Sequence, residues 1–158
     1  MEKFVLRLDK AKKAIDEADY VLIGAGAGLS TAAGIEYTGE RFEKYFHDFI
    51  AEYGFTDMYS SGFYPFKTPE EKWAYWAKHV YANRYDVGKT DVYQKLLQLV
   101  KDKEYFVLTT NVESQFWING FDDERIFATQ GDYGLLQCKT PCHDTLYSNR
   151  EQVFEWVE

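Results

Sequence analysis

The stretch from Tyr20 to Ile35, which reads YVLIGAGAGLSTAAGI, constrains the fold of this chain more than any other segment. Its first four residues are apolar or aromatic and predict a buried strand, and the small residues that follow suit a tight turn and a helix start. Glycine allows positive φ angles and lets a ligand lie directly against the main chain. Because the free N–H groups of a first helical turn attract anions, the segment predicts a phosphate-binding turn of the dinucleotide-binding kind.

The glycine spacing leaves a second interpretation open. It is G-x-G-x-G rather than G-x-G-x-x-G, and the expected strand with an acidic residue about twenty positions further on is missing. The alternative is a glycine-rich turn between a strand and a helix that binds no ligand.

Composition bounds the class of protein. The 158 residues are 46% hydrophobic and suffice for one core, and the net charge of −8 argues against nucleic acid or an anionic membrane as partner. The residues Met1–Phe4 begin no apolar signal segment, and no stretch is apolar enough to cross a membrane. Two cysteines without an export signal suggest a reducing compartment, so we expect a cytoplasmic protein.

Helical and strand patterns alternate along the chain, which predicts the α/β class. A capping box at Thr68–Glu71 starts one helix, whose apolar face is expected to hold Trp73, Trp76, Ala77, Val80 and Tyr81. His47 and His79 are interpreted as packing or surface residues, and the aromatic segment around them as core. The expected elements are helices over 3–18, after the glycine turn, from 69, from about 90 and over 151–157, and buried strands over 20–24, 105–109 and 125–129.

Polar residues follow two of these strands directly. Thr110, Asn111 and Glu113 come after the second strand, and Gln130 after the third. Because ligands bind outside the carboxyl ends of parallel strands, these residues should converge with the glycine turn on one crevice. An Asn there can hold a water or an amide, and a carboxylate can accept an amide N–H. The alternative is that Asn111 and Glu113 cap a helix or a turn.

In these motifs the chain resembles the sirtuins, which are NAD-consuming protein deacylases and ADP-ribosyltransferases. Gly26–Ser30 with Gly34-Ile35 resembles their first motif (G-A-G-I-S, then G-I), and Thr109–Glu113 resembles their T-Q-N-I-D motif. Gln130-Gly131 stands where sirtuins carry a catalytic His followed by Gly. Cys138 and Cys142 stand where the sirtuin zinc module begins.

The resemblance implies one incomplete NAD-binding domain over 1–158. It would contain a partial Rossmann-like parallel sheet with helices, an aromatic-rich helical insertion at about 41–90, and the start of a zinc-ribbon-like module at 137–150. Cys138 and Cys142 are candidate zinc ligands, although without a second pair they are equally well explained as reduced, unliganded thiols. Since the adenosine half of a sirtuin is missing, we expect the chain to be one portion of a larger enzyme, and by itself to bind NAD weakly without turnover.

The resemblance also assigns roles to residues. Asn111 and Gln130 would orient the ribose, Glu113 would hold the nicotinamide amide, and the Gly26–Ser30 loop would bind the pyrophosphate. The sirtuin sequence P-D-F-R is absent after Gly34-Ile35, and Arg41 with Phe42 would replace its cation and ring. The catalytic residues are thus expected to be Asn111, Glu113 and Gln130, and the NAD-binding residues Gly26, Ala27, Gly28, Ser30, Gly34, Ile35, Arg41, Thr110, Asn111 and Gln130.

Glutamine at position 130 alters the expected chemistry. A carboxamide cannot act as the general base that deacylation needs, although it can hydrogen-bond a ribose hydroxyl. The pattern resembles the macrodomain-linked bacterial sirtuins, which are associated with ADP-ribosylation of a lipoyl-carrier protein. We therefore predict an NAD-dependent protein ADP-ribosyltransferase that releases nicotinamide. The alternatives are a deacetylase or deacylase of the same family, with Asp132 as the base, and a non-catalytic module that binds NAD or ADP-ribose.

Overall fold

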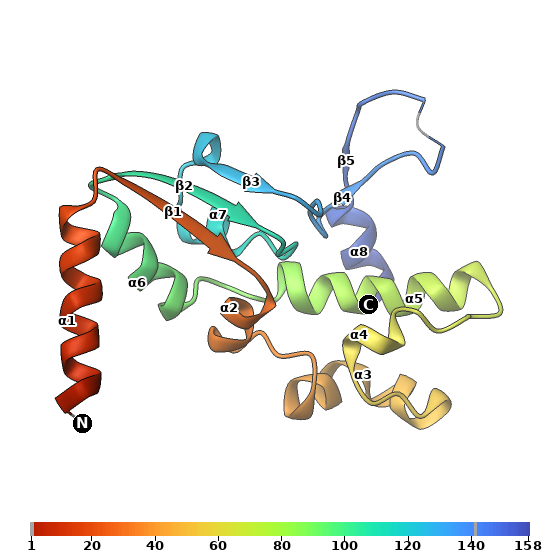
Figure 1. The fold of residues 1–158 in the computed structure, drawn as a ribbon. Helices are drawn as coiled ribbons and strands as arrows, with labels where there is room; N and C mark the ends of the chain where they lie inside the picture. The colour runs from red at the N-terminus through yellow and green to blue at the C-terminus, as the bar shows by residue number, and fades with distance from the viewer. Residues whose placement is uncertain (1, 141) are drawn as a thin grey trace.

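Three parallel strands form the central sheet of the computed structural model, which describes residues 2–140 and 142–158. They are β1 (Tyr20–Ala25), β2 (Glu104–Thr109) and β3 (Ile126–Ala128), in the order β1-β2-β3. A short antiparallel pair, β4 (Leu135–Leu136) and β5 (Tyr147–Ser148), lies toward the carboxyl end of β3 (Figure 1). The α/β class and the parallel sheet predicted from the sequence are therefore confirmed.

Helices connect the strands and make up most of the second quarter of the chain. Thr68 caps α5 as predicted: its Oγ1 accepts a hydrogen bond from the N–H of Glu71 at 3.2 Å. The Glu71 carboxylate in turn accepts from the N–H of Lys67 at 3.0 Å. The helices are α1 (Glu2–Glu17), α2 (Ala27–Ala32), α3 (Gly39–Tyr53), α4 (Met58–Ser61), α5 (Pro69–Val80), α6 (Asp91–Val100), α7 (Gln115–Asn119) and α8 (Arg150–Val157), with a π-helical turn (Tyr81–Tyr85) and a 3₁₀ turn (Asp123–Arg125). None of the described helices combines the length and the apolar character needed to cross a membrane.

The sheet buries only one of its faces. Side chains of that face pack with residues of α6 and α7 in a core of Ile23, Tyr93, Val100, Tyr105, Val107, Phe116 and Phe121. On the other face Tyr20 is 79% exposed, Leu22 70% and Phe127 57%. The prediction of buried strands is thus confirmed for one face of the sheet and wrong for the other, since an apolar run on both faces predicts burial on both and this structure covers one.

A second core fills the aromatic segment, as the sequence predicted. It consists of Phe42, Phe46, Phe49, Phe55, Met58 and Tyr75, with Phe46 and Tyr75 ring centroids 5.1 Å apart. The predicted apolar face of α5 is only partly right. Ala77 and Val80 are buried, but so are Tyr75 and His79, whereas Trp73 is half exposed and packs on Trp156 of α8. Helix α5 contacts both α3 and α8, so one stripe does not describe its burial.

Candidate active site at the carboxyl ends of the strands

The glycine turn and the segments that follow β2 and β3 meet at one cavity. Backbone hydrogen bonds join them beyond the strands, from Thr110 N to Ala25 O (3.1 Å) and from Thr129 N to Thr109 O (2.9 Å). The cavity has a volume of about 390 Å³, within the range of small-molecule sites. Its lining residues are Ala27, Ser30, Thr31, Ile35, Tyr37, Tyr59, Thr110, Asn111, Val112, Glu113, Gln130 and Tyr133. The predicted convergence on one crevice is therefore observed.

The first glycines of the turn, Gly24, Gly26 and Gly28, do not adopt positive φ. Gly26 precedes α2 with an extended backbone, and a Cβ there would lie 3.4 Å from Thr110 Oγ1. A side chain at Gly28 would enter open space, so the main chain is accessible at that position. Gly34, with φ +83°, is the member of this segment that needs the left-handed conformation. The backbone conformation expected of the first glycines is thus found at the end of the motif.

Glu113 is a buried carboxylate held by donors from three segments. It is 4% exposed, and its Oε1 accepts from Ser30 Oγ at 2.6 Å and from Tyr93 OH at 3.2 Å. Its Oε2 accepts from the N–H of Val112 at 3.1 Å. The Ser30 hydroxyl proton is therefore committed to Glu113, while Ser30 still lines the cavity. Burial raises the pKa of Tyr93 to about 12, so this hydroxyl remains a donor at neutral pH.

Asn111 ties the end of β2 to the glycine turn. Its Nδ2 donates to Gly26 O at 3.1 Å and to Tyr93 OH at 3.2 Å. Because both amide hydrogens have partners, the side chain offers its carbonyl oxygen to a ligand. The capping alternative for Asn111 and Glu113 does not hold for the following helix, since the residue preceding α7 is Ser114 and no side chain caps that end.

Gln130 lines the cavity and its side chain is exposed, whereas the side chain of Asp132 bonds to residues outside the cavity. The Asp132 carboxylate pairs with Arg84 Nε at 2.9 Å and accepts from the N–H of Gly134 at 2.6 Å and from the Ser114 hydroxyl. Asp132 is not among the residues that line the cavity. The geometry thus offers no support for Asp132 as a substitute base.

The structure places Arg41 away from the lining of the cavity. Its guanidinium donates to Asn83 Oδ1 at 2.8 Å, to the carbonyl of Ala82, and to the carbonyl of Glu36 at 3.1 Å. Phe42 is buried in the aromatic core. These two residues therefore stabilise the helical segment in this structure, and an NAD-binding role for Arg41 stays a prediction without geometric support.

Sequence reasoning missed the tyrosines of the site. Tyr37, Tyr59 and Tyr133 line the cavity, and the hydroxyl of Tyr93 donates to Glu113 and accepts from Asn111. The sequence is rich in aromatic residues, but no spacing distinguishes the tyrosines that line the cavity from those of the core.

The cysteines gather with a third candidate ligand. Cys138, Cys142 and His143 offer ligand atoms that all lie within 4.8 Å of one another, and Cys138 Sγ is 3.5 Å from His143 Nε2. They lie in the loop between β4 and β5, which projects from the rest of the chain (Figure 1). Thiolate and imidazole are the ligands that zinc prefers. The donor set therefore suits zinc better than two cysteines alone.

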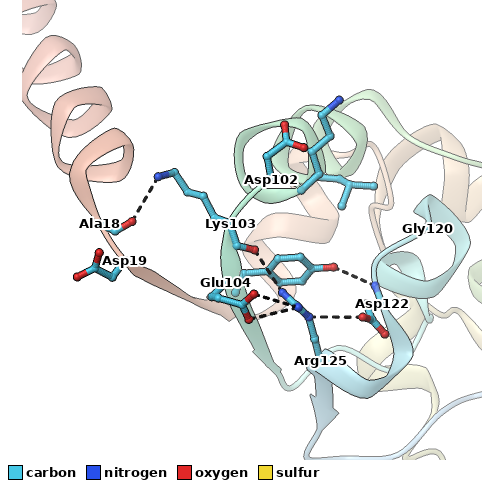
Figure 2. A pocket seen from close by; sticks show the side chains of 11 residues that line it. Ala18, Asp19, Asp102, Lys103, Glu104, Gly120, Asp122 and Arg125 are labelled. Atoms are coloured by element: carbon cyan, nitrogen blue, oxygen red, sulfur yellow. Dashed lines mark hydrogen bonds and ion pairs between the residues drawn. The ribbon is translucent and has the colours of Figure 1, made fainter.

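A larger hollow of about 790 Å³ lies at the opposite, amino ends of the strands (Figure 2). Arg125 and Lys103, two of its three cationic side chains, already have partners. Arg125 lies 3.2 Å from Glu104 and 3.4 Å from Asp122, and Lys103 Nζ donates to Ala18 O at 3.3 Å. Since parallel α/β sheets bind ligands at the carboxyl ends of their strands, we assign the functional site to the smaller cavity.

Comparison with solved structures identifies the fold. A Sir2 homologue in complex with NAD superimposes with a TM-score of 0.63 at 18% identity, covering 89% of this chain and 51% of that one. A second Sir2 enzyme structure gives a TM-score of 0.54 at 16% identity, covering 94% and 52%. The chain therefore has the fold of the Sir2 proteins. No family model matches its sequence.

Two curated proteins match the chain in sequence. The "Protein ADP-ribosyltransferase" of Staphylococcus aureus strain Mu50 is 36% identical over 157 residues, which are 99% of this chain and 50% of that protein. The "Probable bifunctional ADP-ribose hydrolase/ADP-ribosyltransferase" of Fusarium oxysporum f. sp. cubense is 34% identical over 140 residues, or 85% and 23%. The chain thus spans half the length of the first of these relatives and less of the second.

Proposed function

We propose that this sirtuin-like chain forms the nicotinamide and ribose side of the NAD site in a protein ADP-ribosyltransferase. The observation that carries the proposal is the cavity in which Asn111, the buried carboxylate of Glu113 and Gln130 meet at the carboxyl ends of the strands. The names of both curated relatives include ADP-ribosyltransferase, and a solved structure of the same fold contains NAD. NAD is the substrate that supplies ADP-ribose, with nicotinamide as the leaving group.

The polar groups of the cavity suit cleavage of a glycosidic bond. Positive charge develops on a ribose as its base departs, and a fixed carboxylate or carbonyl oxygen stabilises such charge without reorganisation. Glu113 is fixed by Ser30, Tyr93 and its own loop, and a carboxylate has lone pairs left to accept the amide N–H of nicotinamide. Asn111 presents its carbonyl oxygen from a side chain whose amide is anchored on Gly26.

Gln130 favours transfer to a protein over deacylation. Its carboxamide can hydrogen-bond a ribose hydroxyl but cannot accept a proton near neutral pH. The carboxylate of the nearby Asp132 is already bonded to Arg84, Ser114 and Gly134, so it is poorly placed to act as a substitute base. The acceptor proposed from the sirtuin resemblance is a lipoyl-carrier protein.

The test is transfer of label from NAD to a lipoyl-carrier protein by the full-length protein. We expect the label on the carrier, less label when the carrier lacks its lipoyl group, and a loss of roughly tenfold or more in Asn111→Ala because a hydrogen bond to the substrate is removed. The unfolding temperature of this variant separates lost chemistry from lost folding.

Two results would contradict the transferase proposal. One is absence of label on the carrier together with rapid deacetylation of an acetyl-lysine peptide, which would indicate a deacylase. The other is NAD binding without nicotinamide release in the full-length protein, which would indicate a non-catalytic module.

We further propose that Cys138, Cys142 and His143 hold zinc, which would require a fourth ligand beyond this cluster. We expect Cys142→Ser to lower the zinc content of the full-length protein severalfold, because a hydroxyl is a poor zinc ligand in place of a thiolate. Thr140→Ser is the matched control in the same exposed loop. Equal zinc content in both variants, measured by atomic emission, would refute the site. Thiolate ligands also fit the cytoplasmic location proposed for this protein.

A further inference from the structure

A buried histidine contacts the active-site cavity through two tyrosines. His79 of α5 is 2% exposed, and its Nε2 lies 3.1 Å from the hydroxyl of Tyr133. The Tyr133 hydroxyl lies 3.3 Å from that of Tyr37. Tyr37 and Tyr133 line the cavity beside Glu113 and Gln130, whereas His79 does not. The three side chains thus form a row from the aromatic core to the site.

The second nitrogen of His79, Nδ1, determines the direction in which the hydrogen bonds of this row run. Nδ1 is buried and has no hydrogen-bond partner within residues 2–140 and 142–158. Burial, and then the charge of Arg41, lower the pKa of His79 to about 4, so the ring is neutral at pH 7 and carries one N–H. A buried N–H without a partner is rarer than an unpaired acceptor, which places the hydrogen on Nε2, where Tyr133 can accept it.

The direction of the remaining hydrogen bonds follows from this tautomer. With Nε2–H donating to the Tyr133 oxygen, the Tyr133 hydroxyl proton is free to donate to Tyr37. Burial raises the pKa of both tyrosines, so both hydroxyls are protonated at neutral pH. The O–H of Tyr37 is then left for the cavity. The opposite tautomer would reverse each bond and present Tyr37 to the cavity as an acceptor alone.

We propose that His79 is a positioning residue that orients the Tyr133–Tyr37 pair so that Tyr37 donates a hydrogen bond to an oxygen of the substrate. The substrate group that Tyr37 would contact is a hydrogen-bond acceptor oxygen, such as that of a ribose hydroxyl or a carboxamide carbonyl. The inference rests on the proposed function for the identity of this substrate, but the direction of the hydrogen bonds among the three side chains is a property of the protein alone.

The tautomer can be measured without any ligand. Long-range ¹H–¹⁵N spectra of the full-length protein with labelled histidine, assigned by the signal that His79→Gln removes, should show Nε2 protonated and Nδ1 bare at neutral pH. A proton on Nδ1 would overturn the proposal. This result does not depend on NAD, so it separates failure of the inference from failure of the proposed function.

Binding of ADP-ribose tests the consequence at the cavity. Tyr37→Phe should weaken binding to the full-length protein about three- to tenfold, the range for one lost neutral hydrogen bond. His79→Met should give a similar loss, because without the donor the tyrosine pair is free to reverse. The matched variant His79→Gln has a similar length and keeps an N–H near the Nε2 position, so it should restore most of the affinity.

A double variant completes the test. Since both changes act on the same hydrogen bond from Tyr37 to the ligand, His79→Met with Tyr37→Phe should bind ADP-ribose no more weakly than Tyr37→Phe alone. Losses that multiply would overturn the proposal, as would wild-type affinity in His79→Met. Equal losses in His79→Met and His79→Gln would also do so, because they would indicate a packing role.

Discussion

Glu113→Gln is expected to lower the rate of ADP-ribosyl transfer by the full-length protein by about 10²–10³, as when one preorganised electrostatic group is removed from an active site. The carboxylate is 4% exposed and accepts from Ser30, Tyr93 and the backbone of Val112. A charge fixed in this way acts on the positive charge that develops as nicotinamide leaves. The amide keeps the shape of the side chain and removes that charge.

The measurement is single-turnover release of nicotinamide from NAD. Glu43→Gln, at an exposed position of α3, is the matched control and should react at the wild-type rate. The maximal rate should fall more than NAD affinity, because the interaction strengthens as charge develops. A Glu113→Gln enzyme with a wild-type maximal rate and only a raised KM would show that Glu113 serves binding of the amide alone.

Local sequence sufficed to predict the framework of the site. The strand predicted at 20–24 is β1 at Tyr20–Ala25, and the following glycine turn opens α2 as expected. These features depend on short apolar runs, small residues and caps, which act over a few positions. The rule for the carboxyl ends of parallel strands then brings Asn111, Glu113 and Gln130 together, and the cavity contains all three.

Contacts between distant segments could not be predicted in the same way. Ser30 and Glu113 are 83 positions apart, and Tyr37 and Tyr133 are 96 apart. Nothing in the local pattern around His79 indicates that its ring contacts a tyrosine of the site. The same limit explains Arg41, whose partner Asn83 lies on the π-helical turn after α5, so the guanidinium bonds within the helical segment instead of lining the cavity.

Gln130→His is expected to give the full-length protein a deacylase activity about 10²–10⁴ above that of the wild type, the usual gain from general acid–base assistance. Gln130 is exposed at the cavity, so an imidazole there would stay solvated with an ordinary pKa near 6.5. Because the base must be unprotonated, the new activity should rise as the pH increases through about 6.5. Release of the acyl group from an acetyl-lysine peptide measures it.

Gln130→Asn is the matched control, since it changes the side chain without adding a base and should gain no deacylation. Gln130→Ala should slow transfer by the loss of one hydrogen bond, worth about 1 kcal/mol. If Gln130→His binds NAD and still does not deacylate, the block must lie in the segment from Glu36 to Arg41. There Arg41 holds the Glu36 carbonyl and Asn83, in a sequence that departs from the sirtuin motif. Efficient deacylation by the wild type would instead refute this account, because Gln130 would then not be what prevents it.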